Sequence, residues 1–232
     1  MHFMILRRAD RSSEQAAFPL PELSKAVPSG RWLHPSARGA RLRKRDGQWS
    51  VHDVPFADAR ELVAGFTIID VPSKQDAIEW AKTWPTADGE GEVELEVRET
   101  GCSSGCVGFD TQAAAQLTPY IVLLKSDRNT EADLPTPPEV IAQMNAANQA
   151  GVKAGIVLAG EGLQPTSKGA RVKFGGGRST VIDGPFTEIK ELIAGFWLIQ
   201  TATREEAFDW VRNYPFPLGP NMEVELREVV RA

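Results

Sequence analysis

The chain has 232 residues, more than the ~100–150 of a typical single domain, which predicts one large or two small domains. Apolar residues make up 42% and charged residues 25%, as in ordinary soluble globular proteins. The net charge of −5 argues against a nucleic-acid-binding protein, and no apolar run approaches the ~18 residues that a membrane helix needs.

The N-terminus is interpreted as a first strand. Its apolar residues, 3–6, precede Arg7 and Arg8, whereas a signal peptide carries its charges before a longer apolar core. The two cysteines, Cys102 and Cys106, agree with a reducing compartment. We therefore expect a cytoplasmic protein.

The first half of the chain shows few clear elements by itself. Residues 21–27 provide at most a helical turn or two, and the basic run at 41–45 fits alternation along a strand edge. The rest of this half is understood through its repeat in the second half.

A shift of 130 residues aligns the two halves over long stretches. Residues 53–72 match 183–202 at nine of twenty positions, including Asp-x-Pro-Phe and Ala-Gly-Phe. A shift of 117 aligns the first strands, and a shift of 131 aligns Glu92–Leu95 with Glu223–Leu226. Self-similarity of this kind indicates a tandem duplication. It predicts a truncated, degenerate module at 1–99, a linker at 100–117 and a complete module at 118–232.

The linker contains both cysteines in a Gly- and Ser-rich segment. Two thiols cannot complete a tetrahedral zinc site, and the spacing of Cys102 and Cys106 lacks the Cys-x-x-Cys redox form. We expect incidental thiols there, with no metal and no cofactor in the chain.

The second module shows its elements in a clear order. Its expected segments are a strand at 120–124, a helix at 137–149, a strand at 155–161, a glycine-turn hairpin at 170–182, a strand at 192–199, a helix from 203 and a strand at 222–229. This is the split βαβ arrangement. Helices cover one face of such a sheet, so the other face must meet the sheet of the first module.

Three segments carry a resemblance to a known family. Gly160–Pro165, Gly184–Glu191 and Gly195–Ile199 resemble the DGPF branch of the YCII-related proteins. The resemblance covers nearly the whole chain and implies the dimeric α+β barrel of ferredoxin-like modules, here built within one chain. Many DGPF proteins have no established activity, and some are linked to sigma-factor-related transcription proteins. Other YCII-like proteins carry a His–Asp pair proposed as catalytic, but the second module here has no histidine.

Asp183 is the first candidate residue of the Asp-Gly-Pro-Phe motif. A carboxylate at a strand end beside an aromatic can serve as general acid or base, or its side chain can cap the turn that Gly184 and Pro185 form. Asp53 keeps the same place in the first module, which suits a structural role. Glu161, between two glycines, is the candidate partner of Asp183 in an acid–base couple across a cleft.

Further candidates are expected to line a ligand site. Phe186 and Trp197 are either core residues or the wall of a pocket for a flat organic ligand. We expect Phe196 on the helix-covered face and Trp197 on the face toward the other module. His34 can approach Asp53 if their strands are adjacent, although an ordinary structural role of the histidine is the favoured explanation.

Two functions therefore stay open: a small-molecule-binding or accessory protein, and a lyase- or isomerase-like enzyme that uses Asp183. The expected partners are a small organic ligand and, through the less covered first module, a second copy of the chain.

Overall fold

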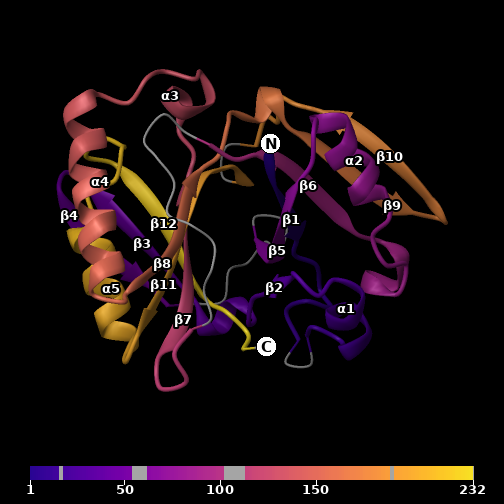
Figure 1. Cartoon of the computed structure of the whole chain (residues 1–232), viewed down its shortest axis with the longest axis horizontal. Coiled ribbons are helices and arrows are strands. Elements are labelled where there is room, and N and C mark those ends of the chain that lie inside the picture. The colour runs from indigo at the N-terminus through magenta and orange to yellow at the C-terminus, as the bar shows by residue number, and fades with distance from the viewer. Residues whose placement is uncertain (16–17, 54–61, 102–112, 189–190, 232) are drawn as a thin grey trace.

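Residues 1–15, 18–53, 62–101, 113–188 and 191–231 are described in the computed structural model of the chain (Figure 1). Their strands form two antiparallel sheets of six strands each, and helices lie on the outer sides of the pair. No described helix is long and apolar enough to cross a membrane. The predicted α+β fold with facing antiparallel sheets is confirmed.

The two sheets repeat one strand order. In the first sheet the order is β10-β9-β6-β1-β5-β2, and in the second it is β4-β3-β12-β7-β11-β8. The first sheet contains β1 (His2–Arg8), β2 (Arg31–Trp32), β5 (Val63–Asp70), β6 (Glu94–Glu99), β9 (Ala170–Gly175) and β10 (Arg178–Asp183). The second contains β3 (Ala40–Arg45), β4 (Gln48–His52), β7 (Thr118–Lys125), β8 (Val157–Gly162), β11 (Ile193–Thr201) and β12 (Met222–Glu228).

The hairpins are exchanged between the modules, which corrects the expectation that each module keeps its own. Hairpin β9–β10 of the second module extends the first sheet at β6, and hairpin β3–β4 of the first module extends the second sheet at β12. The position of β8 explains this exchange for hairpin β9–β10. Leu163, just after β8, forms a backbone bridge with Thr100, just beyond β6 of the first sheet. The chain therefore leaves β8 beside the other sheet, and the 3-10 turn Thr166–Lys168 starts β9 there.

Two backbone bridges join the strands β6-β1-β5-β2 of the first sheet to the strands β12-β7-β11-β8 of the second sheet, so that these eight strands form a closed barrel. One seam is the bridge between Leu163 and Thr100, and the other joins Leu33 to Val229. The barrel interior is filled by buried apolar side chains from both modules, namely Met4, Leu6, Leu33, Val63, Phe66, Ile121, Leu123, Ala159, Leu163, Ile193, Phe196, Leu198 and Val229. Each module thus covers the inner sheet face of the other.

Two further cores lie under the helices. The first sheet is covered by α1 (Pro21–Ala26) and α2 (Lys74–Lys82), and the second by α4 (Pro138–Lys153) and α5 (Arg204–Asn213) (Figure 1). A short α3 (Arg128–Glu131) follows β7. The helix predicted at 137–149 is confirmed and runs on to Lys153, while α1 has only six residues, as expected of a truncated copy.

The last strands of the modules align at a shift of 129, so the shift of 131 was wrong. Leu95 lies opposite Val172, and Val224 lies opposite Leu42, which makes Leu95 and Val224 the equivalent pair. A change of two residues leaves every side chain on the same face of a strand. Alternation alone could not distinguish the two alignments.

Candidate functional site

Asp183 takes part in an ion pair between the modules. Its side chain is 73% exposed at the end of β10, and it accepts a hydrogen bond of 2.7 Å from Nζ of Lys74. Asp53 accepts a bond of 2.8 Å from Nη2 of Arg204 in the same way. Lys74 and Arg204 are the first residues of α2 and α5. Each exchanged hairpin therefore ends in an aspartate that contacts the helix of the other module, which favours the structural interpretation of the motif.

The Gly-Pro-Phe turn that follows packs on the 3-10 turn before β9. A Cβ atom on Gly184 would lie 1.8 Å from the carbonyl oxygen of Thr166, so only glycine fits. The backbone N–H of Phe186 donates to Oγ1 of Thr166 at 3.3 Å, and the guanidinium of Arg171 lies 4.2 Å from the centre of the Phe186 ring. Pro185 is exposed. The turn thus covers Arg171, which is part of a buried cluster of charged side chains.

Glu96 is the centre of that cluster inside the barrel. Its side chain is fully buried, and its carboxylate lies 3.0 Å from Arg98, 3.0 Å from Arg171 and 4.0 Å from Arg8. Burial alone would raise the pKa of Glu96, but the three guanidinium groups outweigh it and hold that pKa below its usual value. Arg171 also pairs with Glu191 at 3.1 Å.

A second cluster repeats the first around Glu225. This buried carboxylate lies 3.0 Å from Arg227, 3.2 Å from Lys125 and 3.9 Å from Arg41. Burial opposes ionisation, yet Lys125, Arg227 and Arg41 lower the pKa of Glu225. Burial is also the main reason why the pKa of Lys125 is lowered. The two clusters are equivalent, since Glu96 and Glu225 occupy matching places on β6 and β12.

Neither cluster was predicted from the sequence, although the sequence contains a signal for both. Each last strand carries Glu-x-Glu-x-Arg, at 94–98 and at 223–227. In a strand that is buried on both faces, charged residues with this period must meet opposite charges inside the protein. The basic run at 41–45 was interpreted as a strand edge, but Arg41 is buried in the second cluster.

Glu161 lies inside the barrel, away from the exposed turn that holds Asp183. It is 5% exposed, lies opposite Phe196 on β11, and shares that residue's interior face. Within the described part of the chain, its Oε2 atom has no hydrogen-bond partner. Among the described residues, no hydrogen bond or ion pair joins Glu161 to Asp183. The expected acid–base couple is therefore not assembled in this structure.

Trp197 and Phe196 lie on the faces opposite to those expected. Phe196 points into the barrel, with its ring 5.8 Å from that of Phe66 in the other sheet, whereas Trp197 packs under the helices. Nε1 of Trp197 donates to Oδ1 of Asn148 at 3.2 Å, and the hydroxyl of Tyr214 donates to the same oxygen at 2.8 Å. The prediction was wrong because β11 is buried on both sides, so alternation separates its two faces without telling which one meets the helices.

His34 does not pair with Asp53 in the part of the chain that the structure describes. Nε2 of His34 lies 3.8 Å from Glu228, and Nδ1 lies 3.4 Å from Nη1 of Arg38. Burial and the charge of Arg38 lower the pKa of His34, and Glu228 opposes them. The ring therefore belongs to a surface ion-pair group at the barrel seam.

A pocket opens at the end of the barrel that faces away from the charge clusters. The pocket has a volume of about 410 Å³. Its position follows from β7, because Pro119 near the start of this strand lines the pocket, whereas Lys125 of the second charge cluster lies at the end of the strand. Its apolar walls include Trp32, Pro119, Leu158, Leu198 and Val229. The pocket combines residues of both modules.

Arg31 supplies the charge in this pocket. Arg31 lies opposite Phe66 of β5, and both side chains are on the sheet face that lines the barrel interior. In the second module, Glu161 occupies the equivalent position opposite Phe196. Within the described ranges, no hydrogen bond or ion pair reaches the Arg31 guanidinium. Arg231, also in the lining, instead donates to the carbonyl oxygen of Leu117. Arg31 was not among the residues predicted to be functional. The signal for it is that an arginine stands where the second copy of the repeat has Glu161 between two glycines.

No set of three His, Cys, Asp or Glu side chains in the described residues is arranged to hold a metal ion. Cys102 and Cys106, for which incidental roles are expected, lie outside the described residues.

Comparisons with known proteins agree with the architecture. The sequence model of the YCII-related domain matches residues 1–100 and again 119–231. An uncharacterized protein of Rhizobium meliloti (strain 1021) is 36% identical over 74 residues, which cover 32% of this chain and 60% of the relative. The match thus spans about three-fifths of that relative's length, and its name assigns no activity.

Proposed function

The chain belongs to the YCII-related family, with two copies of the domain in tandem, and from that premise we propose that it binds small organic anions in the pocket at the barrel end. The observation that carries this proposal is the Arg31 guanidinium, which has no partner among the described residues and lines an otherwise largely apolar cavity.

The pocket matches a ligand with an acidic head and an apolar body. Its volume of about 410 Å³ is within the range of ~300–1,000 Å³ that is usual for small-molecule sites. A carboxylate can accept two parallel hydrogen bonds from a guanidinium, and such charged bonds contribute roughly 1.5–3 kcal/mol. Trp32, Leu198 and Val229 would remove the apolar part of the ligand from water.

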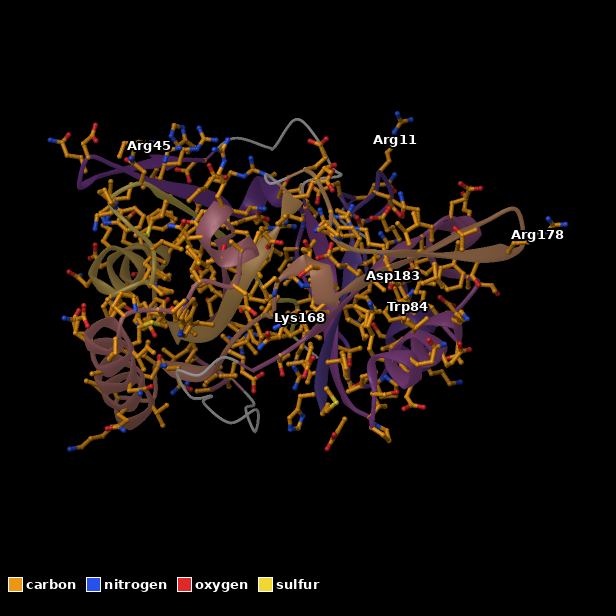
Figure 2. The ribbon with its side chains drawn as sticks, turned by 90° about the horizontal axis from the view of Figure 1, so that it is seen from above. Arg11, Arg45, Trp84, Lys168, Arg178 and Asp183 are labelled. Atoms are coloured by element: carbon orange, nitrogen blue, oxygen red, sulfur yellow. The ribbon has the colours of Figure 1, made fainter. Side chains whose placement is uncertain are left out.

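Calorimetric titration tests this proposal with matched ligands. Aromatic and medium-chain carboxylic acids should bind more tightly than the primary alcohols of the same skeleton. Arg31→Gln should weaken binding of the acids about 10- to 100-fold, as expected for loss of one charged interaction, and should leave the alcohols nearly unaffected. Arg11→Gln is the matched control, because Arg11 projects from the surface (Figure 2). Equal affinity for acids and alcohols would refute the proposal.

The same titration tests the alternative that the ligand site is at Asp183, as an enzyme using this residue would require. Asp183 is exposed and paired with Lys74, so Asp183→Asn should leave binding of the acids unchanged. Loss of binding in this variant would instead place the ligand at the Asp-Gly-Pro-Phe turn.

A further inference from the structure

The outer edge of the first sheet is an open strand. All six residues of β10 are exposed, and among the described strands β10 pairs only with β9. Its apolar side chains Val181 and Ile182 are 40% and 44% exposed. Figure 2 shows the strand running from Arg178 at the hairpin tip back to Asp183. Such an edge presents unpaired backbone groups to any strand that can lie against it.

We propose that β10 pairs antiparallel with β10 of a second copy of this chain, joining the two first sheets into one continuous sheet. The interface is isologous, because each copy contributes the same strand.

The hairpin shows which backbone groups are available. Gly175 and Arg178 flank a two-residue turn, so Arg178, and then Thr180 and Ile182, direct their backbone groups toward β9. The N–H of Gly184 continues this series by donating to the carbonyl oxygen of Gly169. The N–H and C=O groups of the alternate residues, Ser179, Val181 and Asp183, therefore point outward.

Symmetry then restricts the register. A two-fold axis that relates antiparallel strands of one sheet is perpendicular to the sheet, so it brings side chains of the same face opposite one another. Centring the axis on Val181 places it opposite the partner's Val181 and places Ser179 opposite the partner's Asp183. All outward groups of Ser179, Val181 and Asp183 are then paired.

The side chains of this register fit. On one face the two Val181 side chains meet, and on the other Ile182 meets the partner's Thr180, all β-branched residues that favour strand pairs. The charges also complement each other. Lys74 and Lys82, at opposite ends of α2, line one groove along β10, and Lys74 pairs with Asp183. The partner's Asp183 arrives beside Ser179, toward the Lys82 end of the groove.

The corresponding edge of the second sheet lacks this apolar surface. Val51 of β4 is partly buried against the core under α4 and α5, and His52 stands where β10 has Ile182. The self-pairing is therefore assigned to β10. Because one strand pair buries less than the ~1,200 Å² of a standard interface, the dimer should be weak and depend on concentration.

Sedimentation equilibrium of the full chain over a wide concentration range tests the proposal. The wild-type mass should rise from 25.4 kDa toward twice that value. Val181→Lys places two like charges opposite each other and should weaken association at least tenfold. Gln48→Lys adds the same charge to the exposed start of β4 and should behave as the wild type. A wild type that stays monomeric throughout, or a Val181→Lys variant that associates equally, would overturn the proposal.

A crosslink checks the register independently. With Cys102 and Cys106 replaced by serine, Val181→Cys should form a disulfide between copies on mild oxidation, since directly opposite residues have Cα atoms ~5.5 Å apart. Thr180→Cys should crosslink at least tenfold more slowly, because Ile182 of the partner subunit lies opposite it. Equal rates would reject this register.

Discussion

Glu225 illustrates how single residues stabilise the interior of this barrel. Its carboxylate is surrounded by Lys125, Arg227 and Arg41 on strands from both modules. Removing the carboxylate takes the central counter-charge from these buried cations, while Arg41 keeps Glu223 and Arg227 keeps Glu14 as more distant partners. Glu225→Gln should therefore lower the free energy of unfolding by about 3–5 kcal/mol, as is typical when one partner of a buried ion pair is lost. Urea denaturation at neutral pH measures the change, with Glu188→Gln at an exposed site as the control.

The pH dependence follows from the same carboxylate. The folded protein holds the pKa of Glu225 below its usual value. Its stabilising contribution is therefore complete above the unfolded pKa of about 4.3 and is lost as the pH falls through the lower folded pKa. The wild type should lose this part of its stability in acid, whereas Glu225→Gln should show a flatter profile below pH 4. Identical profiles would show that Glu225 does not ionise as described.

The exchanged hairpin depends on the turn that ends it. Gly184 lies against the backbone of Thr166, and the next residues bring Phe186 onto Arg171. The sequence indicated a glycine-dependent bend, but the partner that makes glycine necessary is a segment 18 residues earlier in the chain (184 − 166).

Replacing this glycine tests the contact. Gly184→Ala must displace the turn from the carbonyl oxygen of Thr166 and should cost about 1–3 kcal/mol, as overpacking usually does. Gly219→Ala is the matched control, because a Cβ there meets no atom within 4 Å. Thermal unfolding of both variants measures the difference, and equal midpoints would contradict the contact.

The whole molecule behaves as one unit because its modules share strands as well as a core. Each sheet ends in a hairpin of the other module, and the barrel seams join β2 to β12 and β6 to β8. The covalent linker is therefore not what holds the halves together.

Cutting the linker tests this arrangement. A protease site inserted within residues 102–112 and cleaved in the folded protein should leave both fragments in one particle of unchanged elution volume. The fragments should separate only in denaturant, as followed by size-exclusion chromatography with electrophoresis of the fractions. The uncleaved insertion variant is the control. Separation in native buffer would mean that the shared hairpins and core do not suffice.

The duplication, the truncated first helix and the order of the elements along each module could be predicted from the sequence, because repeats and side-chain periodicity are local properties of the chain. The same patterns identified Asp53 and Asp183 as equivalent, but their cationic partners are on helices of the opposite module. The local sequence pattern around each aspartate does not indicate which distant cation it contacts.

Only the tertiary structure decided which face of β11 meets the helices, where the hairpins pair, and that Arg31 and Glu161 point into the barrel. Alternation with a period of two assigns the residues of a strand to two faces. When both faces are buried, it does not show which face packs under the helices and which lines the barrel. Pairing between distant strands is set by how the two sheets close on each other. That closure depends on the packing of the entire interior and on no single segment.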